Sequence, residues 1–209
     1  MADDEALDLE PASLDLVIHA LGLHWANDPV GQLIQSRRAL RPDGLLIAVL
    51  FGGETLRELR QALAEAEVSE TGGLSPRVAP MAEIRDLGGL MQRAGLALPV
   101  ADSLRVPVSY PSMLALMRDL RAMGETNVLV ERLRRPSRRG MFAAAAVGYA
   151  ARHGDGEGRI PATFELMVLT GWAPAASQPQ PLRPGSATSR LADALGGTAS
   201  GFDGPDTEG

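Results

Sequence analysis

The fold is decided by residues 14–51, which read LDLVIHALGLHWANDPVGQLIQSRRALRPDGLLIAVLF. Residues 14–18 form a short apolar run rich in branched side chains. Such a run is typical of a strand that is buried on both faces of a parallel sheet. Residues 45–51 form a second continuous apolar run. We therefore expect two buried strands, separated by a segment long enough for a crossover connection.

The segment between these strands has the signals of one helix. Asn27 or Asp28 can cap a helix whose first position is Pro29, because proline tolerates the first turn of a helix and lacks the amide hydrogen that is unpaired there. Residues 41–44, Arg-Pro-Asp-Gly, are expected to end the helix in a tight turn. Strand, helix, turn and strand in this order predict a βαβ unit with a right-handed crossover and parallel strands.

The remainder of the chain continues as a mixture of helices and strands, so the predicted class is α/β. Pro99 and Pro107 interrupt the third strand, which indicates an edge strand or a bulge. The methionine-rich stripe of residues 113–123 is interpreted as core, with a substrate pocket as the alternative. Further helices are expected over residues 54–67, 81–94, 113–123 and 141–152, with two more strands over 96–110 and 163–172, making four strands in all.

Composition and charge restrict the function classes. The 209 residues carry a net charge of −6, with a sequence pI of about 5.1, which argues against general affinity for nucleic acid or an anionic membrane. Arginines gather at residues 132–139, and we interpret this cluster as a solvated turn and helix start. The chain has no cysteine, an acidic N-terminus and no apolar stretch of the roughly 18–20 residues that a membrane span needs. We therefore expect a cytoplasmic protein without a membrane span.

Few residue patterns point to chemistry by themselves. The three histidines have no spacing that joins them in a metal site, so no metal is predicted. A G-x-S-x-G nucleophile elbow is missing, and the glycine-rich residues 154–158 follow a helix and are read as a turn. In open α/β sheets a ligand lies beyond the carboxyl ends of the strands. The candidate site is thus His19, Ala20 and Leu21 after the first strand, and Gly52 after the second.

The order of several motifs resembles the S-adenosylmethionine-dependent methyltransferases of class I, which have a Rossmann-like seven-stranded sheet. The resemblance rests on residues 2–7 (ADDEAL), 14–18 (LDLVI), 21–25 (LGLHW) and 38–44 (RALRPDG), and continues through residues 83–90, 116–124 and 160–172 and into residues 181–187 of the tail. The continuation is similar to the branch that includes malonyl-acyl carrier protein methyltransferase and bacterial relatives of a complex I assembly factor.

The resemblance implies S-adenosylmethionine as cofactor. Asp3 would hydrogen-bond the adenine edge, with Glu5 and Ala6 in the wall of the adenine pocket. His19, Ala20 and Leu21 would face the methionine half of the cofactor and the methyl acceptor, although relatives usually have a small polar pair ending in Asn where this chain has His19–Ala20. No residue is predicted as catalytic, because methyl transfer depends mainly on positioning.

The resemblance also implies that the family's first strand and glycine-rich cofactor loop lie upstream of Asp3, so we expect an N-terminally truncated enzyme. The expected organisation is an incomplete methyltransferase domain over residues 1–172, a helical insertion over 111–160 between the last two strands, and a largely disordered tail over 173–209 with a short helix near 189–195. Three functions stay open: methyl transfer to a small molecule or protein, a non-catalytic assembly factor that binds a protein partner through the insertion, and hydroxylation of a protein arginine.

Overall fold

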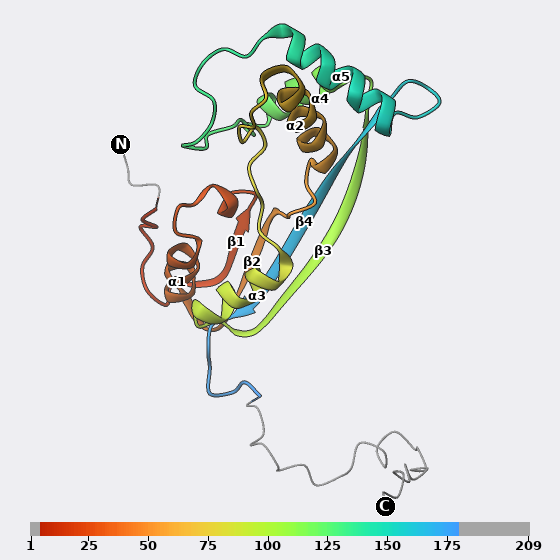
Figure 1. The fold of residues 1–209 in the computed structure, drawn as a ribbon. Helices are drawn as coiled ribbons and strands as arrows, with labels where there is room; N and C mark the ends of the chain where they lie inside the picture. Colours follow the sequence, from red (N-terminus) through yellow and green to blue (C-terminus); the bar gives the residue numbers. More distant parts are fainter. Residues whose placement is uncertain (1–4, 180–209) are drawn as a thin grey trace, which may run out of the picture. The chain divides into compact units, whose positions relative to one another are not determined.

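The computed structural model describes residues 5–179, and all elements lie in the compact unit Met1–Ala175 (Figure 1). A four-stranded sheet has the order β1-β2-β4-β3, with β1 at Leu14–Ala20, β2 at Leu40–Phe51, β4 at Ile160–Trp172 and β3 at Ala97–Tyr110. Strands β1 and β2 are parallel, whereas β4 runs antiparallel to both of its neighbours. The predicted α/β class and the edge position of the proline-containing strand β3 are confirmed.

Helix α1, Pro29–Ala39, makes the predicted crossover between the parallel strands β1 and β2. The Asp28 side chain caps it by accepting a hydrogen bond from the Gly31 amide at 2.8 Å. Helix α1 ends before residues 41–44, as predicted, but these residues are part of β2 and do not form a separate turn. They make an irregularity within the strand, because Leu14 pairs with Leu40 and Leu16 pairs with Leu45. Asp43 has a φ of 64°, and its amide donates to the Ala173 carbonyl at 3.2 Å. This pairing with the residue that follows β4 keeps the segment in the sheet.

The other helices are η1 (Leu23–Trp25), α2 (Arg57–Thr71), α3 (Ile84–Arg93), α4 (Met113–Ala122) and α5 (Arg139–His153). Helix α2 begins three residues later than predicted because Glu54 and Thr55 bond to β4 instead. The Glu54 amide donates to Glu165 Oε2 at 2.9 Å, and the Thr55 hydroxyl donates to the Glu165 carbonyl at 3.1 Å. Helices α4 and α5 form the predicted insertion between β3 and β4. The predicted helix near residues 189–195 lies outside the described residues.

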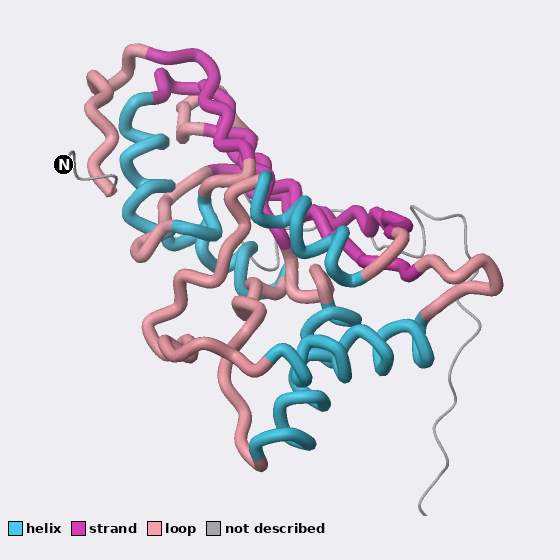
Figure 2. Tube along the Cα trace, turned by 90° about the horizontal axis from the view of Figure 1, so that it is seen from above, coloured by secondary structure: helices cyan, strands magenta, loops and turns pink. Residues whose placement is uncertain are grey.

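The two faces of the sheet differ in their cover. Leu46, Ala48 and Leu169 are fully buried and face the helices, which Figure 2 shows gathered on one side of the strands. The opposite face carries Ile18 and Val100, which are 62% and 58% exposed. The segments of residues 5–179 thus cover one face of the sheet and leave apolar side chains of the other in contact with solvent.

The buried side chains form two clusters. The cluster under α1 and α3 includes Leu33, Leu46 and Met91, and it covers the middle of the sheet. The other cluster includes Leu59, Leu116, Met141, Tyr149 and Phe164, and it packs α2, α4 and α5 against the end of the β3–β4 pair. The insertion therefore has a core of its own, which α2 shares.

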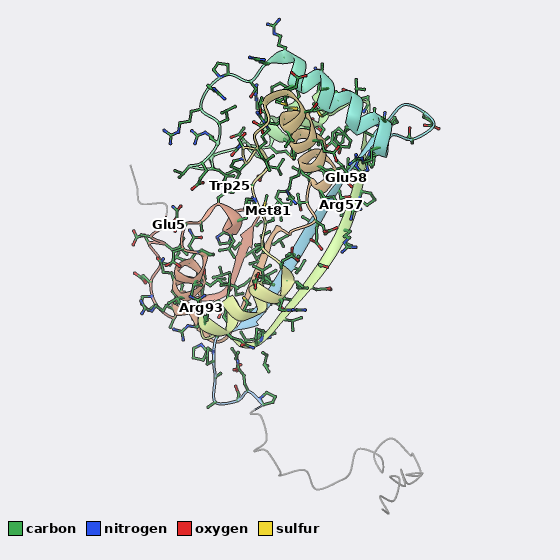
Figure 3. The ribbon with its side chains drawn as sticks, in the orientation of Figure 1. Glu5, Trp25, Arg57, Glu58, Met81 and Arg93 are labelled. Atoms are coloured by element: carbon green, nitrogen blue, oxygen red, sulfur yellow. The ribbon has the colours of Figure 1, made fainter. Side chains whose placement is uncertain are left out.

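A buried carboxylate ties α2 to β4. Glu58 accepts hydrogen bonds from the Thr163 hydroxyl at 2.5 Å and from the Thr163 amide at 3.1 Å. Burial raises the pKa of Glu58, but the hydrogen bonds from Thr163 and Arg57 outweigh it, so the pKa lies below its ordinary value. Figure 3 shows Arg57 and Glu58 together at the start of α2, beside the strands. The pair fixes the position of this helix relative to the sheet.

An ion pair ties the segment after α2 to the same helix. Arg77 donates to Glu67 through Nε at 2.9 Å and through Nη2 at 2.7 Å, and both side chains are largely buried. Ser75 also donates to Glu67, and Arg77 donates onward to Ser137 Oγ at 3.0 Å. The Arg77 guanidinium, followed by the Ser75 hydrogen bonds, lowers the pKa of Glu67 to about 2.

Replacing Glu67 with Gln is expected to lower the free energy of unfolding by about 3 kcal/mol at neutral pH, because Arg77 would stay buried without its counter-ion. A carboxylate whose pKa falls on folding contributes stability above its ordinary pKa of 4.5, and that contribution is lost as the pH falls toward 2. Urea unfolding of the wild type and E67Q at several pH values should therefore show a difference that shrinks below pH 4.5.

The matched control is Glu70→Gln, which changes an exposed carboxylate of the same helix and should cost less than about 0.5 kcal/mol. An E67Q penalty that is equally large in acid and at neutral pH would contradict this account.

Candidate functional site beyond the carboxyl ends of β1 and β2

The β3–β4 pair carries the insertion past the ends of the parallel strands. Strand β2 ends at Phe51, which lies opposite Leu166 of β4, whereas β3 and β4 stay paired as far as Tyr110 and Ile160. Helices α4 and α5 leave the sheet at this far end. Because β1 and β2 are parallel, their carboxyl ends meet at the same edge, so the insertion lies beside the edge where ligands of α/β sheets bind.

His19, Ala20 and Leu21 lie at this edge, but β1 is longer than predicted, so His19 and Ala20 are its last two residues and only Leu21 follows it. The His19 Nε2 atom lies 2.9 Å from Gln32 Oε1 of α1, and His19 Nδ1 is buried with no hydrogen-bond partner among residues 5–179. Leu21 is 43% exposed and has a φ of 50°, and its amide donates to the Val49 carbonyl at 2.7 Å. Gly22 is so close that a side chain there would approach the His19 ring to 3.0 Å.

Glu5 joins the start of the described chain to the turn before α1. Its carboxylate accepts hydrogen bonds from the Asn27 amide at 2.9 Å, the Asn27 side chain at 3.0 Å and the Asp28 amide at 3.3 Å. The bond from the Asn27 backbone is the main cause of a lowered Glu5 pKa. Ala6 is exposed, and Asp3 lies outside the described residues. Glu5 contacts the turn before α1, and His19 contacts Gln32 of α1, so both residues lie against the start of this helix.

A cavity of about 550 Å³ lies between η1, α2 and the insertion. Trp25 and Met81, both labelled in Figure 3, line it from the sheet side and from the segment before α3. Its apolar lining consists of Trp25, Ala26, Leu56, Leu59, Leu63, Val78, Ala79, Pro80, Met81, Met117, Leu120, Val128, Leu129, Val130 and Phe142. Its polar lining consists of His24, Asn27, Arg77, Arg121, Glu125, Thr126, Asn127 and Glu131. This size and lining suit a small ligand or one inserted side chain.

The cavity and the predicted cofactor residues are neighbours and do not coincide. His19, Ala20 and Leu21 are not part of the lining, whereas His24 to Asn27 are. Asn27 connects the two groups because it lines the cavity and donates to Glu5. The methionine-rich stripe of residues 113–123 contributes to the core and also to the cavity. Leu116 is fully buried, whereas Met117 lines the cavity.

One polar pair of the cavity has no signal in the sequence. His24 Nε2 lies 3.2 Å from Glu125 Oε1, and the two residues are 101 positions apart. The two side chains are 6% and 14% exposed. The His24 ring packs between Trp25 and Phe51, with ring centroids at 5.4 Å and 5.2 Å. Only the folding of the insertion over η1 brings these residues together, so no local motif predicts them.

The arginine cluster borders a second cavity of about 390 Å³. Arg77, Arg135 and Arg138 line it together with Glu67 and Glu70, so charges of both signs are present. Arg134, Arg135, Arg138 and Arg139 are all exposed, in agreement with a solvated turn and helix start. Within residues 5–179, no helix is long and apolar enough to cross a membrane, and no three His, Asp or Glu side chains form a cluster for a metal ion.

Comparison with known proteins finds similarity to methyltransferases and to one hydroxylase. Residues 1–48 match a family described as a methyltransferase domain. Over 193 residues the chain is 42% identical to the mitochondrial arginine-hydroxylase NDUFAF5 of Danio rerio, and over 188 residues it is 42% identical to that of Homo sapiens. Over 175 residues it is 38% identical to the malonyl-[acyl-carrier protein] O-methyltransferase of Laribacter hongkongensis.

These matches cover most of this chain and only part of each relative. They include 92%, 90% and 84% of the chain, but 60%, 54% and 56% of the respective relatives. Among solved structures, a methyltransferase fold protein from Bacillus halodurans matches with a TM-score of 0.50 at 12% identity, over 83% of this chain and 76% of that one. This last likeness concerns the fold alone.

The Glu5 contacts make a direct prediction about local stability. Replacing Glu5 with Ala removes the acceptor of the Asn27 and Asp28 amides, so both amides should exchange hydrogen faster than in the wild type. Amide hydrogen exchange followed by NMR measures this effect. Asp8→Ala, which removes a nearby exposed carboxylate, should leave both rates unchanged. Equal rates in E5A and the wild type would show that Glu5 does not hold this turn.

Proposed function

We propose that the chain belongs to the class I methyltransferases, in the branch of NDUFAF5 and malonyl-[acyl-carrier protein] O-methyltransferase, and that the whole protein is an S-adenosylmethionine-dependent methyltransferase. The observation that carries this proposal is the unpaired His19 Nδ1 at the carboxyl end of β1, beside a cavity built by the insertion. The chain spans little more than half the length of these relatives. The activity of the whole protein is therefore stated as a proposal.

The residues at the edge of β1 suit the methionine half of the cofactor. His19 Nδ1 is a buried polar atom that lacks a partner among residues 5–179, and such an atom favours a ligand that supplies one. Ala20 and Leu21 are exposed and leave the strand end accessible. Glu5 and Ala6 would lie toward the adenine, with Asp3 beyond them. When bound, S-adenosylmethionine supplies an electrophilic methyl group on a sulfonium sulfur.

The cavity is the proposed acceptor site. Its lining includes His24 to Asn27, which follow His19, Ala20 and Leu21 in the chain, so the proposed acceptor site is built from the segment that leaves β1. The apolar walls exclude water and orient the acceptor, and transfer reactions gain most from such positioning. This division assigns binding of the cofactor to β1 and its following loop, and selection of the acceptor to α2 and the insertion.

Hydroxylation of a protein arginine is the second candidate. It is favoured by the identity to NDUFAF5, which at 42% exceeds the 38% to the malonyl methyltransferase. The two candidates share the cavity as acceptor site and differ in the group that the acceptor gains. For either, we propose a cytoplasmic location and a protein partner that docks on the insertion.

Calorimetry of the full chain with S-adenosylhomocysteine tests the cofactor site. Replacing His19 with Leu should weaken binding about tenfold, because a hydrogen bond to a charged ligand group is lost. His153→Leu is the matched control, since it removes another buried imidazole with an unpaired nitrogen, away from this edge. Equal affinity of H19L and the wild type would remove His19 from the site.

Mass spectrometry of candidate acceptors separates the two reactions. Incubation with S-adenosylmethionine and either an arginine peptide or malonyl-acyl carrier protein should add one methyl group to an acceptor. Addition of one oxygen atom to the arginine peptide, in a parallel assay supplied with molecular oxygen and a two-electron reductant, would instead favour the hydroxylase. An absence of S-adenosylhomocysteine binding together with unmodified acceptors would overturn the methyltransferase proposal for this chain.

A further inference from the structure

Glu125 of the insertion is a largely buried carboxylate in the lining of the apolar cavity. Helix α4 ends in a turn at Gly124, which has a φ of 85°, and the Glu125 amide donates to the Leu120 carbonyl at 2.9 Å. The Gly124 amide donates to the Arg121 carbonyl at 3.2 Å. These two bonds form a Schellman motif, which fixes the residue that follows the glycine. The backbone of Glu125 is therefore held in place although it lies outside the helix.

The Glu125 side chain is held from the opposite wall. His24 Nε2 donates to Glu125 Oε1, because a carboxylate in contact with this nitrogen can only accept. The packing of the His24 ring against Trp25 and Phe51 prevents it from turning away. Glu125 Oε2 has no partner among residues 5–179. One oxygen of the carboxylate is thus used for positioning, and the other is available to a ligand.

The other charged residues that line the cavity do not neutralise the Glu125 carboxylate. Arg77 also lines the cavity, but its guanidinium is bound by Glu67 through two nitrogens. Arg121 and Glu131 are exposed at the lining and are opposite in sign. A largely buried carboxylate next to apolar walls binds most strongly a cation that donates hydrogen bonds, because both groups lose water and each then needs a partner.

We propose that Glu125 binds the head of the acceptor, that this head is a cationic N–H donor on an aliphatic stem, as in an arginine or lysine side chain, and that His24 is the positioning residue of Glu125. The stem would pack on the wall that includes Leu59, Met81 and Met117. The free carboxylate of a malonyl thioester would be repelled by Glu125. The inference rests on the proposed function, since it takes the cavity to be the acceptor site.

Binding of short capped peptides to the full chain, without cofactor, tests the proposal. The probes are glycine peptides with a central arginine, lysine or citrulline, where citrulline has nearly the shape of arginine but no charge. The wild type should prefer the arginine or the lysine peptide to the citrulline peptide by about tenfold or more, as expected for charge-assisted hydrogen bonds. Glu125→Gln should abolish the preference, whereas Glu131→Gln, a matched change at the same cavity, should leave it in place.

The role of His24 has its own readout. His24→Leu should reduce the preference for the cation, and His24→Gln, which keeps an amide donor, should restore part of it. Nitrogen NMR of His24 should show a proton on Nε2 in the wild type, and this tautomer should become mixed in E125Q. If a variant unfolds, the wild type alone still tests the proposal, through its preference for the arginine or lysine peptide over the citrulline peptide.

The outcomes are distinct from those of the proposed function. Equal binding of arginine, lysine and citrulline peptides by the wild type would overturn the inference, even if a methyl acceptor were found. An unchanged preference in E125Q would also overturn it. A chain that prefers the cationic peptide through Glu125 but transfers no methyl group would support the inference, and would contradict the methyltransferase proposal alone.

Discussion

The antiparallel position of β4 between β2 and β3 is the constraint on which the arrangement of the molecule depends. Strand β3 must run past the end of β2 before the chain can return through β4, since Tyr110 pairs with Ile160 and Phe51 already pairs with Leu166. The connection between β3 and β4 is consequently placed beside the carboxyl ends of the parallel strands. The insertion forms a cavity with η1 because this register leaves it at that edge.

Buried polar contacts hold helix α2 and the segment that follows it beside the carboxyl ends of β1 and β2. The residues after β2 bond to β4 through Glu165, and Glu58 of α2 bonds to Thr163. Glu67 and Arg77 then hold the segment that leads to Met81 on the cavity wall. The cavity is thus bounded by elements whose positions are fixed by hydrogen bonds to the sheet and to α2, and its charged lining is positioned by the same contacts.

The sequence predicts the elements better than it predicts their contacts. Asp28 and Pro29 mark the start of α1, and Pro99 and Pro107 mark an edge strand, because each acts through its own backbone. The expected turn at residues 41–44 is instead an irregularity inside β2, because Asp43 bonds to Ala173, which is distant in the sequence. His24 and Glu125 were missed for the same reason. The βαβ pattern predicts that residues 19–21 lie near the strand end, but it misses that His19 and Ala20 belong to β1. Their role toward a cofactor is a proposal.

Methyl NMR of the full chain, with its methionine methyl groups labelled, tests most directly that the acceptor enters the cavity between η1 and the insertion. Met81 and Met117 line this cavity, whereas Met91 and Met167 are buried in the other core cluster. Our account predicts nuclear Overhauser contacts from a bound arginine or lysine peptide to Met81 and Met117, with no contact to Met91 or Met167. Binding of the peptide without any contact to Met81 or Met117 would contradict it.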